Sequence, residues 1–187
     1  MSDFVNLDWE QIAALAAAAL GVFWMVGAYN RLIALRNAMV QAWAKVDDAL
    51  RMRAQAAQPL LQALREPLAA EQGALDMAQA ALADAGRAAV QMSARPVAEA
   101  RAAAWVAAEA ALAAAASRVF ALLEQAPQAR EAAPVAAGAA AWRESQSRLA
   151  FARQLFNDAA QAYDEAIALF PTRLLAPMFG FAPAGRI

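Results

Sequence analysis

Alanine occupies about a third of the 187 positions of this chain, and no other feature limits its fold so strongly. Alanine has the highest intrinsic helix propensity, because it loses no side-chain entropy when a helix forms. Threonine and tyrosine are scarce, and no run of alternating valine or isoleucine indicates a strand. With 7 glycines and 8 prolines, the alanine does not belong to a collagen-like or linker sequence. The composition therefore predicts an all-α protein.

One stretch near the N-terminus is long enough and apolar enough to cross a membrane. Residues 11–30 carry no charge, and about 20 helical residues span a hydrocarbon core of roughly 30 Å. Trp9 and Tyr29 flank the stretch, as aromatic residues do at the two membrane interfaces. A buried alanine-rich helix is the alternative, whereas a cleaved signal peptide would need a basic region before the apolar run. The pattern favours a transmembrane helix over 11–30.

The charges on either side of this stretch predict its orientation. Residues 1–10 contain Asp3, Asp8 and Glu10 but neither lysine nor arginine, whereas Arg31 and Arg36 follow the apolar run. Basic residues are retained on the cytoplasmic side of a membrane. We therefore expect a single-pass protein with a short extracytoplasmic N-terminus over 1–10 and a cytoplasmic domain.

The apolar spacing after Tyr29 predicts that the membrane helix continues without a break. Large apolar residues recur at intervals of three and four: Leu32, Leu35, Met39, Trp43, Val46 and Leu50. The first helix should end near Arg65, with Pro59 as a potential kink. Further helices are expected over 67–92, 96–125 and 139–169, the last preceded by a loop that contains Pro134 and Gly138. Residues 31–170 should form an elongated antiparallel up-down four-helix bundle, followed by a non-regular tail over 171–187.

Counting helices brings this tail back to the membrane. In an up-down bundle the fourth helix returns to the end at which the first began, which places Phe170 near Tyr29 and Asn30. An interfacial position and a position capping the bundle core are both compatible with the tail, and we expect some of each. The candidate membrane-surface residues are Arg173, Leu174, Leu175, Phe179 and Phe181.

The residue inventory argues against catalysis. Cysteine and histidine are absent, which excludes disulfides, ordinary zinc sites, iron–sulfur clusters and histidine-based chemistry. Phosphate-binding and nucleophile-elbow motifs are missing. Asp158 and Glu165 share a helix face but lack the histidine of a di-iron bundle. A net charge of −1 with scattered arginines does not suit nucleic-acid binding. We expect no enzyme activity, no cofactor and no metal.

Three asparagines stand out because asparagine is a poor choice within a helix. Asn30 and Asn37 lie seven residues apart on one face, and Asn157 follows an aromatic residue as Asn30 does. One explanation is that they form hydrogen bonds that fix the register between helices. The other is that they form a polar surface patch that binds a partner. The sequence leaves both open. Asp47 and Arg51 form the i,i+4 arrangement of an ordinary surface pair.

Two groups of motifs resemble the LemA family. The first comprises Tyr29 to Asn37, Ala42-Trp43 and Val46-Asp47; the second comprises Ala152-Arg153, Phe156-Asn157-Asp158-Ala159, Tyr163, Phe170-Pro171, Leu174-Leu175-Ala176 and Phe179-Gly180-Phe181. Phe156 stands where the family usually has tyrosine, and residues 66–140 match weakly. The resemblance adds Trp43, Asp47, Arg153 and Asp158 to the candidate register or partner contacts. It implies a helical bundle anchored in the bacterial inner membrane, with no agreed reaction.

These observations predict a non-enzymatic scaffold or adaptor at the cytoplasmic membrane face. It would act through self-association, as a homo-oligomer, or by binding a helix of a membrane-protein partner. The alternative is an accessory or regulatory subunit of a membrane-bound enzyme or protease. The lipid bilayer is the partner common to both.

Overall fold

The computed structural model describes residues 8–170 and 172–187, and their regular structure is helical. Its elements in chain order are α1 (Trp9–Leu64), η1 (Ala69–Glu71), α2 (Gln72–Ala94), α3 (Glu99–Glu124), α4 (Pro127–Glu131), α5 (Ala133–Ala168), α6 (Thr172–Leu175) and η2 (Pro177–Phe179). An isolated bridge between Ala98 and Ala184 is the nearest feature to a strand in the described part. The all-α prediction is confirmed. The expectation for residues 1–7 of the N-terminal segment lies outside the described residues.

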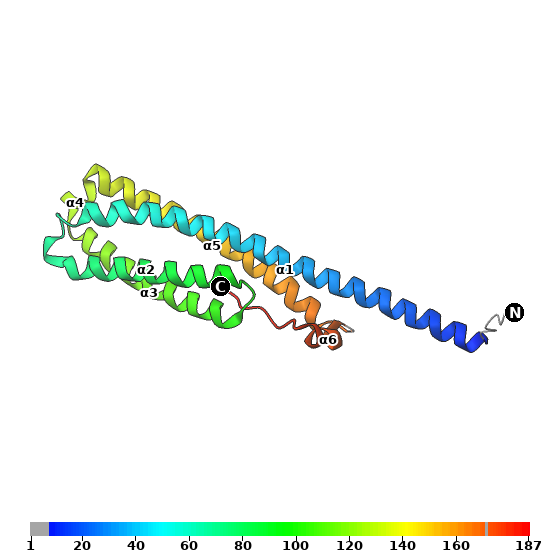
Figure 1. Cartoon of the computed structure of the whole chain (residues 1–187). Coiled ribbons are helices and arrows are strands. Elements are labelled where there is room, and N and C mark those ends of the chain that lie inside the picture. The colour runs from blue at the N-terminus through cyan, green and yellow to red at the C-terminus, as the bar shows by residue number, and fades with distance from the viewer. Residues whose placement is uncertain (1–7, 171) are drawn as a thin grey trace.

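The long helices run up and down as two adjacent pairs. Helix α1 packs along α5, and α2 packs along α3 (Figure 1). Helix α2 also contacts α1 and so joins the two pairs. The short helix α4 makes the turn from α3 into α5 at one end of the bundle, and α6 lies at the other (Figure 1). The arrangement is the elongated antiparallel bundle that the sequence predicts.

Helix α1 has two very different halves. It is 56 residues long, or about 84 Å at 1.5 Å per residue. Every side chain from Asp8 to Gly27 is exposed, and this segment projects beyond the other helices (Figure 1). From Leu32 onward the stripe is buried in the bundle, and Pro59 is accommodated inside the helix on its exposed side. A single helix thus joins an uncovered apolar segment to the bundle core.

The bundle core is divided along its length. The end nearer Tyr29 holds the cluster called here the aromatic core, whose members include Met39, Trp43, Met92, Trp105, Leu149, Phe156, Tyr163 and Phe181. The far end holds two smaller clusters, called here the aliphatic core, built from Ala57, Leu60, Leu64, Leu75, Leu82, Leu112, Val119, Leu123 and Val135. The packing of the two cores therefore rests on different side chains.

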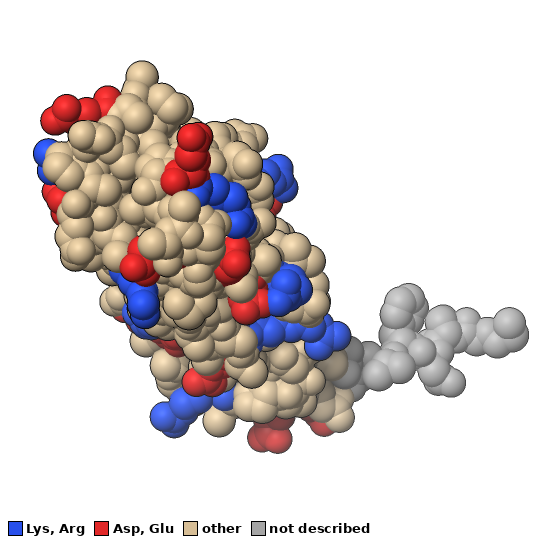
Figure 2. All heavy atoms as spheres, turned by 90° about the vertical axis from the view of Figure 1, so that its left-hand side faces the viewer, with Lys and Arg blue, Asp and Glu red and all other residues tan. Residues whose placement is uncertain are grey.

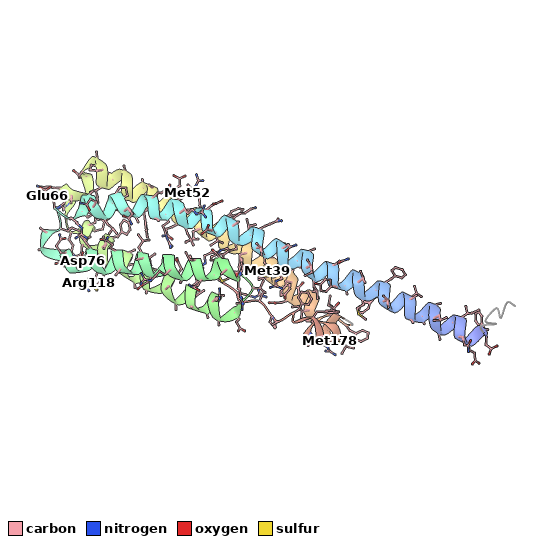
Figure 3. The ribbon with its side chains drawn as sticks, in the orientation of Figure 1. Met39, Met52, Glu66, Asp76, Arg118 and Met178 are labelled. Carbon is pink, nitrogen blue, oxygen red and sulfur yellow. The ribbon has the colours of Figure 1, made fainter. Side chains whose placement is uncertain are left out.

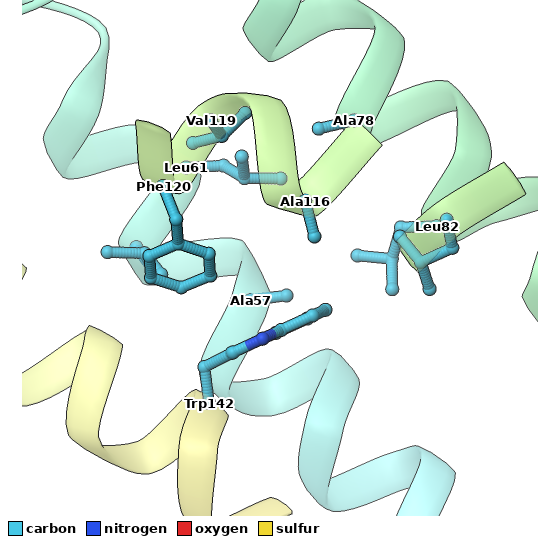
Figure 4. A pocket seen from close by; sticks show the side chains of 10 residues that line it. Ala57, Leu61, Ala78, Leu82, Ala116, Val119, Phe120 and Trp142 are labelled. Carbon is cyan, nitrogen blue, oxygen red and sulfur yellow. The ribbon is translucent and has the colours of Figure 1, made fainter. Parts of the chain in front are cut away.

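Aromatic rings contact one another closely in the aromatic core. The Trp43 ring lies 5.6 Å from Trp105 and 5.9 Å from Phe156, centroid to centroid, in edge-to-face geometry. The aliphatic core instead contains an apolar pocket of about 30 Å³, into which Trp142 projects opposite Ala116 (Figure 4). A pocket without polar partners does not hold a water firmly. The aliphatic core therefore borders unfilled apolar space.

The largest differences from the predicted helix boundaries are at the starts of α5 and α2; α3 also begins three residues later than expected, and the short helix α4 occupies part of the predicted loop. Helix α5 begins at Ala133 instead of near 139, and its first turn includes Pro134. Proline is tolerated there because the first turn needs no amide donor. Gly138 lies inside this helix. A Cβ at this position would lie 3.0 Å from the Leu60 Cβ, so glycine lets α5 approach α1 closely. Helix α2 begins at Gln72 instead of Pro67, after a turn and η1.

The tail is more regular than the sequence predicts. Residues 172–175 form α6, and η2 follows over Pro177–Phe179. Gly180 ends η2 with a φ of +70°, a left-handed conformation that favours glycine. The turn redirects the chain, so that residues 181–187 run back along the bundle (Figure 1).

Candidate functional site

The buried face of α1 carries a charged residue within an otherwise apolar repeat. Buried positions recur at intervals of four and three: Met39, Trp43, Val46, Leu50, Arg53, Ala57, Leu60 and Leu64. Helix α3 repeats the spacing with Ala102, Trp105, Glu109, Leu112, Val119 and Leu123. Such spacing is typical of helix seams packed as in coiled coils. Arg53 and Glu109 therefore occupy core positions, and the same repeat in the sequence could have identified them.

Arg53 and Glu109 form a buried ion pair that joins α1 to α3. Two parallel hydrogen bonds, of 2.6 and 2.7 Å, run from the guanidinium to the carboxylate. Arg53 is 3% exposed and Glu109 is 8% exposed. Each of the two charges is stabilised in the protein interior by the other, because an unpaired buried charge is strongly destabilising. The pair lies between Leu50 of the aromatic core and Ala57 of the aliphatic core, and it was missed by the sequence-based prediction.

Predicted residues from both ends of the chain meet around Trp105. Trp43 packs edge-on against the Trp105 ring, and the Arg153 guanidinium carbon lies 5.1 Å from that ring's centroid. This distance falls within the range of a cation–π interaction. The indole nitrogen of Trp43 donates a 2.8 Å hydrogen bond to Ser93 Oγ, which itself donates to the Ala89 carbonyl. The motif residues Trp43 and Arg153 thus support the aromatic core.

The end of the tail is held on α5 by side chains that bond to its main chain. Asn157 Nδ2 donates to the Ile187 carbonyl oxygen at 2.6 Å, and the Ile187 amide donates to Asn157 Oδ1 at 2.9 Å. Asp164 Oδ1 accepts a 2.8 Å hydrogen bond from the Ala184 amide. Asn157 therefore joins the tail to a helix, whereas the register hypothesis places its hydrogen bonds between helices.

Close packing against α3 completes this docking. A Cβ at Gly185 would lie 2.4 Å from the Ala102 Cβ and 2.7 Å from the Glu99 Cα. Contacts that short do not occur between real side chains, so position 185 requires glycine. Phe181, Ala184 and Ile187 are buried and belong to the aromatic core. Residues 181–187 therefore close the side of the bundle, and the prediction of a membrane-surface position is wrong for Phe181.

The first part of the tail lies beside the start of the bundle portion of α1. The Tyr29 ring is 5.3 Å from Phe179 and 5.8 Å from Phe181, in edge-to-face contacts. Phe170 and Trp24 line a common groove. The end of α5 therefore lies beside this part of α1, as helix counting predicts, although the rings in contact with Tyr29 belong to the tail. Leu174 and Phe179 are exposed, as is Arg173, and the side chain of Leu175 lies outside what the structure describes.

A second groove opens between α1, the α2–α3 turn, α5 and the tail. It has a volume of about 630 Å³, and its lining includes Arg36, Arg95, Glu99 and Tyr163. Burial raises the pKa of the Tyr163 phenol above its ordinary value of 10.0. The positive charge of Arg36 acts in the opposite direction, and the carboxylate of Asp164 adds to the effect of burial. The phenol therefore keeps its proton at neutral pH.

The remaining predicted residues lie on the surface. Asn30, Asn37 and Asp158 are exposed. Asp47 is half-buried and pairs with Arg51 one helical turn away, as its spacing predicts. The exposed asparagines leave the partner-patch hypothesis open. Among residues 8–170 and 172–187, no three carboxylates come close enough to hold a metal ion.

Two helices of the described chain are long and apolar enough to span a membrane. The apolar window of α1 has a mean hydropathy of 1.9, and none of it is buried. That of α3 has a mean hydropathy of 1.7, and part of it is buried in the bundle. By length and composition alone both are weak candidates. The α1 segment is distinguished because nothing in the described structure covers it.

An all-helical bundle with an uncovered apolar N-terminal helix is the class that these features define. The model of the LemA family matches residues 42–186, which is most of the chain. The chain belongs to the LemA family. Trp43 and all of the C-terminal motifs lie within the match, whereas the Tyr29–Asn37 segment precedes it. A search of curated protein sequences gave no match.

Proposed function

We propose that this LemA-family chain is a non-enzymatic scaffold, anchored in the bacterial inner membrane by the first part of α1. The observation that carries the proposal is the uncovered apolar segment, which continues without a break into a core helix. A membrane would remove that apolar surface from water at a gain of about 25 cal/mol per Å². The flanking charges support an external N-terminus and a cytoplasmic bundle.

The continuous α1 makes the anchor a rigid tether. A flexible linker would let the domain rotate freely at the surface. Here residues 31–64 continue the membrane helix for about 51 Å at 1.5 Å per residue, and α5 packs along them. The bundle is thereby held in one direction relative to the bilayer. A scaffold benefits from such a geometry, because its binding surfaces face the same partners on every molecule.

Exposed apolar side chains on the outside of the bundle support binding through helices. Val40 and Met52 on α1, Val90 on α2 and Phe151 on α5 are all exposed. An amphipathic partner helix, or a second copy of the chain, would cover such residues. Arg148 lies near Met52 and pairs with Glu144, so polar groups border the exposed Met52 side chain.

Purification of the full chain in mild detergent tests the proposal, with the mass of the complex determined by light scattering. The scaffold proposal expects a homo-oligomer or a stable complex with a non-enzymatic membrane protein. A stoichiometric enzyme or protease subunit would favour the alternative regulatory role. A monomer that stays soluble without detergent would contradict the membrane anchor. An F151D variant, which places a charge on the outer face, should dissociate the complex and leave the bundle folded.

A further inference from the structure

The end of α5 and the first part of the tail present apolar side chains that no other part of the described structure covers. Phe170 is 74% exposed and Met178 is 77% exposed, with Leu169, Leu174 and Phe179 also open to solvent. They lie at the end of the bundle beside the uncovered half of α1, and Met178 marks that end in Figure 3. Exposed apolar residues gathered in this way indicate a contact surface.

The position of this surface along α1 matches the edge of the proposed membrane span. Phe170, Leu169 and Thr172 share a groove of about 370 Å³ with Trp24 and Arg31. Trp24 and Arg31 are seven residues apart, which is about 10 Å along a helix. The groove therefore extends from the level of the first basic residue to a level inside the apolar run. A lipid that lies there would meet a guanidinium at its headgroup and an indole beside its acyl chain.

Basic side chains surround this surface, and acidic ones are absent from the adjoining segments. Residues 28–40 and 166–187 contain Arg31, Arg36, Arg173 and Arg186 and neither aspartate nor glutamate. Of these four, Arg186 has a carboxylate partner among the described residues, Asp164 at 3.7 Å. The opposite end of the bundle shows acidic and basic groups interspersed (Figure 2), with pairs such as Arg65–Asp76 and Arg130–Glu124. The two segments that adjoin this surface therefore carry a net positive charge.

We propose that α6 and η2 form a second membrane contact, which inserts shallowly and binds anionic phospholipids. The inference rests on the proposed anchor in α1 and adds a lipid preference to it. The apolar side chains would enter the boundary between headgroups and acyl chains, and Arg31 and Arg173 would meet the phosphates. Each basic residue near an anionic surface strengthens membrane association by about fivefold at 25 °C. Lipid is the occupant because the surface continues the anchor and carries the complementary charge.

The absence of cysteine makes this contact directly measurable. An M178C variant of the full chain, labelled with an environment-sensitive fluorophore, would be placed in nanodiscs that contain shallow spin-labelled lipid as quencher. The matched control is M77C, because Met77 is exposed on α2 near the opposite end of the bundle. The proposal expects quenching at position 178 in discs with phosphatidylglycerol, several-fold weaker quenching in phosphatidylcholine alone, and none at position 77. Replacing Arg31 and Arg173 by glutamine should remove the lipid preference, whereas R87Q/R118Q should not.

Three results would overturn the proposal. Quenching of equal strength in both lipids would remove the anionic preference. A label that stays in water in both would remove the membrane contact. A label that is immobilised without lipid quenching would show that a protein covers the tail. Each of these results still requires incorporation into the disc through α1, so it would leave the anchor standing. Failure to incorporate would contradict the proposed function itself.

Discussion

The two ends of the bundle are built from different materials, although the same helices run through both. The aromatic core contains interlocked rings and is closed by the docked tail. The fully buried residues of the aliphatic core are alanine, leucine and valine, with Phe120 and Trp142 packed against them, and the core retains an apolar pocket of about 30 Å³. The Arg53–Glu109 pair lies between them. Long-range contacts that demand particular residues are therefore concentrated at the end next to the apolar segment of α1.

This difference explains where the family motifs lie. Three motif residues contact partners far away in the sequence. Trp43 contacts Ser93, 50 positions away, and Arg153 contacts Trp105, 48 positions away. Asn157 contacts Ile187, 30 positions away. An alanine-rich helix can fill the aliphatic core with many alternative sequences, because small side chains impose few shape requirements. Within residues 66–140 the exceptions are Trp105 and Glu109, which make specific contacts with Trp43 and Arg53.

The largest effect is expected at the boundary between the two cores. Removing one charge by E109A leaves the Arg53 guanidinium buried without a partner, which should lower the free energy of unfolding by about 3–5 kcal/mol. The double variant R53M/E109L removes both charges and should lie within about 1–2 kcal/mol of the wild type. Chemical unfolding in detergent, followed by circular dichroism, measures both. If the double variant is as unstable as E109A, the loss of stability is not caused by an unpaired buried charge, and this explanation is wrong.

Undocking the tail should weaken the aromatic core selectively. In G185A the added methyl would collide with Ala102 and Glu99, so we expect a loss of about 1–3 kcal/mol and faster hydrogen exchange over residues 181–187. The control is G86A, where a Cβ meets open space within α2 and alanine should add roughly 0.5–1 kcal/mol. Wild-type exchange rates in the G185A tail would show that the tail is not held as described.

The same substitution should have opposite effects in the two cores. Ala116 borders the apolar pocket, so A116V should fill part of it and add up to about 1 kcal/mol of stability. Ala160 is fully buried in the aromatic core, and A160V should cost about 1–3 kcal/mol through overpacking. Thermal unfolding of both variants measures the contrast. Equal losses would mean that the aliphatic core is as tightly packed as the aromatic one.

A smaller effect concerns alkaline pH. Burial raises the pKa of Tyr163 above 10.0, so the folded state holds the phenol proton more tightly than the unfolded chain does. This contribution to stability is fully present below about pH 10 and is lost as the pH rises through the folded pKa. The midpoint temperature of unfolding should therefore decrease as the pH is raised above 10. In the Y163F variant this temperature should decrease less steeply with pH. Identical alkaline slopes for the two proteins would contradict the assignment.

Much of the fold is encoded in local patterns and could be predicted from the sequence. The length of α1 could be predicted from its helical apolar spacing, and the position of Phe170 near the level of Tyr29 could be predicted by counting helices. Both predictions depend only on patterns among residues that are near one another in the chain. The docking of residues 181–187 could not be predicted in the same way. It depends on main-chain hydrogen bonds to Asn157 and on the fit of Gly185, which require three-dimensional neighbours.

The Arg53–Glu109 pair falls between these cases. Each residue interrupts an apolar repeat in its own helix, and that signal is visible in the sequence. Which helix supplies the partner is set by the way the α1–α5 and α2–α3 pairs face each other, and the sequence alone does not state it. The start of α5 at Ala133 is compatible with Pro134, because proline is tolerated in a first turn. Gly138 lies inside the helix, where the close approach of Leu60 favours glycine despite its low helix propensity.

The central claim is that α1 crosses the membrane with the bundle on the cytoplasmic side. Single cysteines at Asp8 and Ser147, both exposed in this otherwise cysteine-free chain, can be reacted with a membrane-impermeant maleimide on intact spheroplasts. The account predicts labelling of D8C in intact spheroplasts and of S147C only after the membrane is permeabilised. Labelling of S147C in intact spheroplasts, or recovery of the chain in the soluble fraction, would contradict it.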